Sequence, residues 1–153
     1  MAKRKLKWNA RGIRKSLHAN LGVIFDKHVK HEFVDRDVDA TMKTMGKEPY
    51  VHIVATFRGW RGNKGVYEFY KNHFVGKMPP DTNVTKISRT VGKDQVVEEL
   101  ILSFTYDREI DFMLPGVKQI GEYVELPHVV VMRFRDGNRT ETKLGGKTWI
   151  VCA

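Results

Sequence analysis

The sequence predicts an α+β fold, with helices packed on one face of a curved antiparallel sheet. In the first quarter of the chain, apolar residues recur at steps of three and four, which is typical of helices. From residue 84 onward, apolar and polar residues alternate along several segments, which is typical of strands. Helices that come first and strands that follow in succession favour α+β over alternating β-α units.

The first predicted helix spans residues 14–35, where one apolar stripe is formed by Leu17, Leu21, Ile24, Phe25, Val29 and Phe33. A second, shorter helix is predicted from Asp37 to about Met45. Asp35 or Asp37 would cap its start, and Gly46 would end it.

A strand is predicted over residues 50–57, which are rich in β-branched and aromatic side chains. The following segment, RGWRGNKG (58–65), is interpreted as a glycine-rich loop, because it matches neither the dinucleotide-binding nor the P-loop fingerprint. A third helix is predicted over residues 65–74, and the prolines in residues 78–81 would end it.

Residues 84–91 and 95–107 are predicted to form a hairpin. A two-residue loop at its tip would create three facing pairs: Arg89 with Glu98, Ile87 with Leu100, and Thr85 with Leu102. One face of this hairpin would then carry Arg89, Glu98, Leu100, Leu102 and Phe104. A second hairpin is predicted over residues 128–144 with its turn at 136–138, and residues 147–153 could add a last strand.

The length of 153 residues suits one domain, and the formal charge of +9 is concentrated at one end. Of the 27 Lys and Arg residues, seven lie in residues 1–15, which leaves 20 against 18 Asp and Glu in the rest. We therefore expect a basic tail over 1–15 and a single domain over 16–153. The tail could be a solvated terminus, or could contact phosphates or an anionic membrane non-specifically. Specific nucleic-acid binding is not expected, since no zinc-finger or RNA-recognition signature occurs.

The sequence also bears on the cellular compartment. Its apolar runs are far shorter than the roughly 18 residues needed to span a bilayer, and it has no secretory apolar segment. The single cysteine, Cys152, cannot form an internal disulfide. A reducing, cytoplasmic location is expected, and the acid-free N-terminus leaves organelle targeting as the alternative.

Five blocks in order carry a resemblance to a known family: residues 28–45, 65–74, 88–107, 111–117 and 124–137. They resemble the SnoaL-like branch of the nuclear-transport-factor-two-like superfamily, which includes ketosteroid isomerases, scytalone dehydratase, limonene epoxide hydrolase, polyketide cyclases and purely binding members. The resemblance implies a cone-shaped α+β barrel, in which a curved antiparallel sheet wraps around helices, with a ligand pocket at its open end, and a homodimer. Fold alone leaves the function open.

The C-terminal stretch departs from the family pattern. Relatives continue with a strand of the type His-Glu-His-x-Tyr-Trp-Asp, whereas residues 138–153 here read NRTETKLGGKTWIVCA. This stretch contains neither His nor Asp and is interrupted by Gly145 and Gly146. A catalytic group that the family takes from this strand is therefore missing.

Asp111 is the first candidate catalytic residue, because three bulky apolar residues, Phe112, Met113 and Leu114, follow it directly. At the rim of the pocket these neighbours would desolvate its carboxylate and favour a proton-transfer role. In the alternative interpretation, Asp111 caps a turn before Pro115 and the apolar residues fill the barrel mouth.

Arg89 and His52 are the other candidate catalytic residues. Arg89 opposite Glu98 could position or polarise a ligand, or form an ordinary salt bridge at the rim. His52, in the middle of a predicted strand, could point inward as a base or remain a solvated histidine.

The remaining candidates for ligand binding are Trp60, Tyr70, His73, Glu98, Phe104 and Met113, which could equally form the core. His28 and His31 lie three residues apart, but no carboxylate or cysteine completes a metal-binding spacing. Neither a metal nor another cofactor is expected.

These observations predict a pocket protein that performs proton transfer on a small, apolar, carbonyl-containing metabolite. Isomerisation, cyclisation and dehydration are versions of this chemistry, with Asp111 or His52 as base and Arg89 or Tyr70 stabilising the oxyanion. The alternative is a ligand-binding or dimeric interaction module of the same fold without catalysis.

Overall fold

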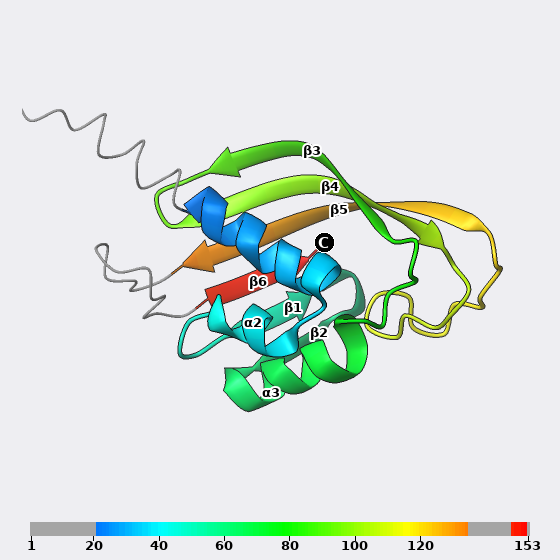
Figure 1. The fold of residues 1–153 in the computed structure, drawn as a ribbon, viewed down its shortest axis with the longest axis horizontal. Helices are drawn as coiled ribbons and strands as arrows, with labels where there is room; N and C mark the ends of the chain where they lie inside the picture. The colour runs from blue at the N-terminus through cyan, green and yellow to red at the C-terminus, as the bar shows by residue number, and fades with distance from the viewer. Residues whose placement is uncertain (1–20, 135–147, 153) are drawn as a thin grey trace, which may run out of the picture.

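The structure is a computed structural model that describes residues 21–134 and 148–152. A curved six-stranded sheet has the order β2-β1-β6-β5-β4-β3, and the helices lie on one face of it (Figure 1). The strands are β1 (Tyr50–Ile53), β2 (Arg58–Arg61), β3 (Asn83–Val91), β4 (Gln95–Thr105), β5 (Tyr123–Phe134) and β6 (Thr148–Cys152). The predicted α+β class is confirmed, but the sheet does not close into a barrel.

The helical layer begins with a helix whose described part covers residues 21–30 and which continues as the π-helical turn η1 (His31–Asp35). The short helix α2 (Val38–Lys43) follows, and the Asp37 side chain accepts a hydrogen bond from the Ala40 backbone N–H. This confirms Asp37 as the N-cap, where an aspartate satisfies an otherwise unpaired donor. Helix α3 (Gly62–Phe69) ends in a second π-helical turn, η3 (Tyr70–Phe74).

The glycine-rich segment after β1 differs from its prediction. The strand predicted over 50–57 ends at Ile53, and η2 (Val54–Thr56) with Phe57 reverses the chain. Residues 58–61 then pair antiparallel with β1 as strand β2, so the predicted loop is wrong. The strand was not predicted because glycine has a low strand propensity. In the structure, Gly59 lets the strand pass close to the Tyr50 ring.

The β3–β4 hairpin keeps its predicted tip but changes register beyond it. Arg89 faces Glu98 as predicted, but an irregularity between Lys86 and Ser88 shifts the rest by one residue. Lys86 therefore lies opposite Leu100, and the predicted pairs of Ile87 and Thr85 are wrong. A bulge of this kind adds one unpaired residue to a strand and bends it.

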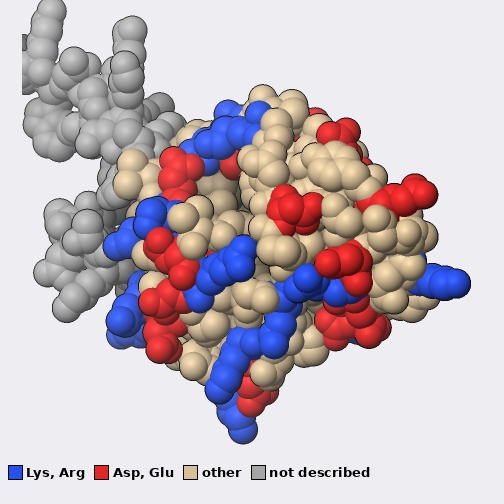
Figure 2. Space-filling view, turned by 45° about the vertical axis from the view of Figure 1, so that its right-hand side comes forward, with Lys and Arg blue, Asp and Glu red and all other residues tan. Residues whose placement is uncertain are grey.

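The divergent C-terminal residues complete the sheet. β6 pairs antiparallel with β5 and parallel with β1, so the sheet is mixed rather than purely antiparallel. The predicted turn at 136–138 lies outside the described residues, as does the basic tail. Along the described chain, no helix combines the length and apolar character needed to cross a membrane. On the face shown in Figure 2, acidic and basic side chains are interspersed.

Candidate functional site

A cavity of about 60 Å³ lies between the helices and the inner face of the sheet. Its wall is almost entirely apolar, and its aromatic residues are Phe25, Phe33, Phe69, Tyr70, Phe74 and Phe112. Such a volume holds a few water molecules or a ligand of a few heavy atoms. An apolar cavity with a small number of polar groups is typical of small-molecule sites.

Three polar side chains meet in one part of the cavity wall, two of them buried and the third, Glu32, largely buried. His28 Nε2 lies 3.0 Å from Glu32 Oε1 and 3.1 Å from the Tyr70 hydroxyl. His28 and Glu32 are four residues apart on successive turns of one helix, which places them on the same face. Tyr70 comes from the end of α3, and its side chain is also buried.

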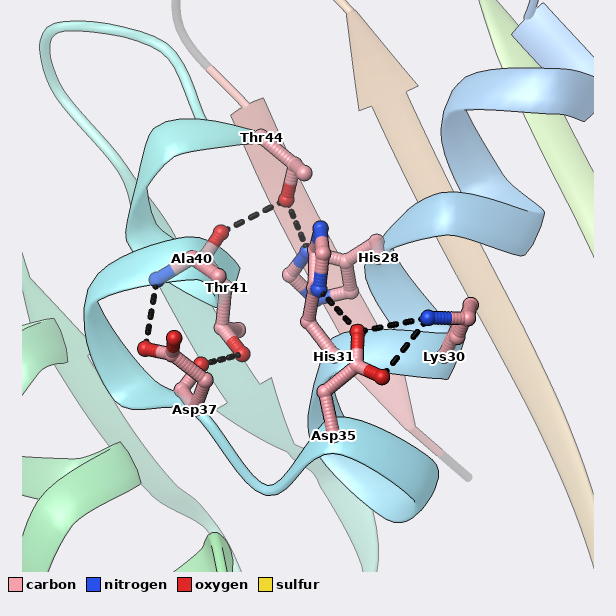
Figure 3. Close-up of polar contacts among 8 residues, drawn as sticks. All are labelled: His28, Lys30, His31, Asp35, Asp37, Ala40, Thr41 and Thr44. Carbon is pink, nitrogen blue, oxygen red and sulfur yellow. Dashed lines mark hydrogen bonds and ion pairs between the residues drawn. The ribbon is translucent and has the colours of Figure 1, made fainter.

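The hydrogen-bond partners of His28 define its tautomer. Its Nδ1 lies 2.5 Å from the Thr44 hydroxyl, which itself donates to the Thr41 carbonyl at 2.6 Å (Figure 3). We assign the Thr44 proton to the bond with the Thr41 carbonyl, so that Thr44 Oγ1 accepts from His28 and His28 Nδ1 carries a hydrogen. The remaining nitrogen, Nε2, is therefore the one that faces Glu32 and Tyr70.

The contact of 3.0 Å between His28 Nε2 and Glu32 Oε1 needs a hydrogen between the two atoms, so we infer that the pair holds one proton in addition to that on Nδ1. Without it, the Nε2 lone pair and a carboxylate oxygen would face each other at 3.0 Å, which is repulsive. The proton can reside on His28 as an imidazolium–carboxylate pair or on Glu32 as a carboxylic acid that donates to Nε2. Both arrangements carry no net charge, which suits an apolar cavity.

Tyr70 remains protonated beside this pair. Burial, and secondly the negative charge of Glu32, raise the pKa of the Tyr70 hydroxyl well above its ordinary value. It therefore acts as a hydrogen-bond donor rather than a phenolate.

Both helical segments that supply these groups have π-helical turns at the site. Glu32 lies in η1, and Tyr70 is the first residue of η3, where its carbonyl accepts from the Val75 N–H at 2.7 Å. Single π-helical turns inside α-helices occur frequently at functional sites. In η1, Asp35 binds Lys30 and His31 and thereby fixes the end of the helix.

Two more polar side chains line the cavity from the sheet. His128 of β5 donates its Nδ1–H to the Leu126 carbonyl at 3.1 Å, which leaves Nε2 as an acceptor when the ring is neutral. Cys152 of β6 is a free thiol. Burial, followed by the Glu32 charge, raises the pKa of Cys152 to about 12, so it remains a thiol near neutral pH.

Two of the predicted ligand-binding residues, Tyr70 and Met113, line this cavity. Asp111 does not; its carboxylate is 38% exposed and lies 2.8 Å from His73 Nδ1. Arg58 donates to the Asp111 backbone carbonyl at 2.9 Å. Trp60 packs against this group, with its ring centroid 6.1 Å from that of His73. The structure thus brings Asp111, His73 and Trp60 together in a second, more exposed cluster.

The predicted pair of Arg89 and Glu98 is confirmed as an ion pair, and it lies outside the cavity wall. Phe104 is buried in the core. His52 shares its face of β1 with Tyr50, whereas Val51 and Ile53 line the cavity, so the inward orientation considered for His52 is wrong. Catalytic roles for Asp111, Arg89 and His52 stay predictions.

His28, Glu32, His128 and Cys152 were not predicted as a site from the sequence. A signal was present for the first two, since both fall at helical spacing in the apolar stripe that runs through Phe25 and Phe33. His128 likewise alternates with apolar residues along one face of β5.

No protein-family model matches the chain, and no curated protein matches it in sequence. Solved structures do match its fold. A hypothetical protein with a ketosteroid isomerase-like fold from Catenulispora acidiphila, in complex with trimethylamine, is 11% identical with a TM-score of 0.59. That alignment covers 85% of this chain and 83% of the other.

Two further structures extend this comparison. An NTF2-like protein of unknown function from Cytophaga hutchinsonii is 15% identical with a TM-score of 0.56, and the alignment covers 87% of this chain and 99% of the other. A candidate SnoaL-like polyketide cyclase from Shewanella denitrificans is 12% identical with a TM-score of 0.57, with 86% and 89% covered. The chain therefore has the fold that its sequence resemblance implied.

Proposed function

We propose that this chain, which shares the fold of SnoaL-like and nuclear-transport-factor-two-like proteins, binds a small apolar carbonyl compound and transfers protons on it. The observation that carries the proposal is the contact of 3.0 Å between His28 Nε2 and Glu32 Oε1 in the wall of an apolar cavity. Proton-transfer groups held in a water-poor site act more strongly than they would in water.

The pair supports a balanced reaction. The Glu32 carboxylate takes a proton from the carbon next to the ligand carbonyl, while His28 Nε2 gives its proton to the carbonyl oxygen. The products are an enol, a neutral His28 and a protonated Glu32 that can donate to Nε2. Returning a proton to a different carbon completes an isomerisation. Because no net charge is created in the cavity, the apolar wall does not oppose the step.

Tyr70 and Thr44 have supporting roles in this proposal. The Tyr70 hydroxyl, 3.1 Å from Nε2, can donate to the developing oxyanion. Thr44 holds the His28 ring so that Nε2 faces the cavity. The neighbour crystallised with trimethylamine and the candidate polyketide cyclase support a small-molecule role in this fold.

A second location for the same chemistry is the exposed cluster around Asp111. The His73–Asp111 contact of 2.8 Å would orient the imidazole as a base, with Arg58 nearby as a cation. A third outcome is ligand binding without catalysis, with a homodimer formed through the sheet.

Deuterium exchange into a small ketone, such as cyclopentanone in D₂O, followed by NMR, tests these alternatives. Reaction at the cavity predicts that Glu32→Gln lowers exchange by about 10²-fold or more, while Asp111→Asn stays close to wild type. The reverse result would assign the reaction to the Asp111–His73 cluster. Ketone binding without exchange would leave a binding module, and the absence of both would remove the proposal.

A further inference from the structure

The polar side chains that line the cavity include two fixed hydrogen-bond acceptors, Glu32 and His128. Among the described lining residues there is no Lys, Arg, Asn or Gln, and the polar side chains are His28, Glu32, Tyr70, His128 and Cys152. Glu32 supplies carboxylate oxygens, and His128 offers Nε2 because its Nδ1–H is bound to the Leu126 carbonyl. A ligand that donates hydrogen bonds can therefore pair with the Glu32 carboxylate and with His128 Nε2.

The charge of the cavity points in the same direction. Among the lining residues that the structure describes, Glu32 is the only carboxylate, and we take the proton shared with His28 as its positive counterpart. An anionic ligand would meet the carboxylate with no fixed cation to compensate it. A ligand that brings its own positive charge could instead replace the shared proton.

We propose that the cavity binds a small lipophilic ammonium ion, which pairs with Glu32 and displaces the proton held between His28 and Glu32. The ammonium group forms the ion pair, and His28 becomes neutral with its hydrogen on Nδ1, bound to Thr44. The proton leaves to solvent, so the charge of the cavity is the same before and after binding.

The apolar wall suits the rest of such a ligand. Aromatic side chains such as Phe25, Phe33 and Phe112 surround the space, and aromatic rings attract cations through their negative faces. The volume of about 60 Å³ limits the ligand to a few carbon atoms around the nitrogen. This proposal uses the same cavity as the proposed function but does not require catalysis.

Other titratable groups could in principle contribute to proton release. Burial raises the pKa of both Tyr70 and Cys152, so both are protonated before the ligand binds. The proposed ion pair with Glu32 forms without removing either proton. His128 is the other histidine among the described lining residues. A His128→Gln variant separates its contribution from that of His28.

The experiment is calorimetric titration of the full chain with three ligands that share one five-membered ring. These are cyclopentylammonium, cyclopentanone and cyclopentanecarboxylate, each measured at pH 7 in two buffers of different ionisation enthalpy. We expect cyclopentylammonium to bind at least about 10-fold more tightly than the carboxylate, which is about 1.4 kcal/mol. It should release about one proton per ligand, as linkage between binding and protonation requires.

The variants sharpen this result. Glu32→Gln should weaken cyclopentylammonium binding by at least about 10-fold while changing cyclopentanone binding by less than about 3-fold. His28→Gln should abolish proton release, whereas His128→Gln should retain it. Glu99→Gln, which changes an exposed acid on the neighbouring strand, is the matched control and should behave as wild type.

Three outcomes would overturn the proposal: equal binding of the ammonium and the carboxylate, ammonium binding without proton release, or full binding by Glu32→Gln. The first two are read from the wild-type chain, so the test survives if a variant does not fold. If cyclopentanone binds but cyclopentylammonium does not, only this inference fails. If neither ligand enters, the proposed function fails as well.

Discussion

Asp26 accepts two hydrogen bonds from the Arg89 guanidinium, at 2.5 Å from Nη2 and 3.1 Å from Nη1. The same guanidinium binds the buried carboxylate of Glu98 through Nε and lies 4.9 Å from the Phe25 ring centroid. Through these ion pairs Arg89 links the helix of residues 21–30 to strands β3 and β4. Since this helix also carries His28 and Glu32, the ion-pair network positions the cavity wall.

Replacement of Arg89 by methionine tests how much these ion pairs stabilise the fold. Glu98 is only 3% exposed, and without Arg89 its nearest cation is Lys86 at 3.6 Å. Removing one partner of a buried ion pair costs about 3–5 kcal/mol of unfolding free energy, because the other charge stays desolvated. Urea unfolding should show a loss of this size, whereas Arg108→Met, at an exposed pair with Asp107, should cost less than about 1 kcal/mol. Equal losses would mean that Glu98 is solvated.

Acid should weaken the same contact through Asp26. The Arg89 hydrogen bond is the main cause that lowers the pKa of Asp26 below its ordinary value of 3.8. A carboxyl with a lower pKa in the folded state stabilises the fold above the unfolded pKa and loses that contribution as the pH falls through the folded pKa. Because the Asp26 side chain is 57% exposed, the contribution should stay below about 1 kcal/mol.

The measurement is the difference in unfolding free energy between wild type and Asp26→Asn, followed from pH 5 to pH 2. The difference should start to shrink near pH 4, where Asp26 of the unfolded chain becomes protonated, and should be lost as the pH falls through the lower pKa of the folded state. Asp35, Asp81 and Asp107 also have lowered pKa values, so the slope of wild type alone is not diagnostic. A difference that stays constant with pH would show that the charge of Asp26 does not contribute.

Thr44 should control the tautomer of His28. Thr44→Val removes the acceptor of the buried Nδ1–H, and a buried donor without a partner costs about 1–3 kcal/mol. Thr44→Ser keeps the hydroxyl and should keep both stability and tautomer. Long-range ¹H–¹⁵N NMR spectra of the imidazole should show hydrogen on Nδ1 in wild type and Thr44→Ser. A wild-type ring with hydrogen on Nε2 alone would contradict the assignment.

Cys152 should react slowly with alkylating reagents. With a pKa of about 12 instead of 9.0, its thiolate population below pH 9 is about 10³-fold smaller than that of an ordinary thiol. Iodoacetamide should therefore modify the folded protein far more slowly than the urea-unfolded chain, which serves as the control. Glu32→Gln should accelerate the reaction, because the Glu32 charge is one cause of the raised pKa. Equal rates in the folded and unfolded protein would contradict the burial of this thiol.

The sequence predicted the elements of this fold better than its site. Periodicity located the helices and the long strands, because burial of one face imposes a regular spacing of apolar residues. The site depends instead on tertiary contacts, such as that between Thr44 and His28, which sequence spacing does not encode. His28 and Glu32 were overlooked because polar residues in an apolar stripe are indistinguishable from hydrogen-bonded core residues without their partners.

Asp111 was predicted to lie at the cavity, but its carboxylate does not line it. Its apolar neighbours suggested a sheltered carboxylate, and Phe112 and Met113 do line the cavity. In the turn that begins there, however, Asp111 points toward His73 and Arg58 instead. Neighbours in sequence share an environment only when the backbone keeps their side chains on one face.

The bulge in β3 provides the last prediction. A regular hairpin would have placed Ile87 opposite Leu100, whereas the shift at Lys86 and Ser88 leaves Ile87 53% exposed and Val84 in the cavity wall. Ile87→Lys should therefore change the unfolding free energy by less than about 0.5 kcal/mol, as surface substitutions usually do. Val84→Asp should cost several times more, because it brings a second carboxylate toward a largely apolar wall that already holds Glu32. Thermal and urea unfolding of the two variants measure this contrast. A larger loss of unfolding free energy for Ile87→Lys would contradict the shifted register.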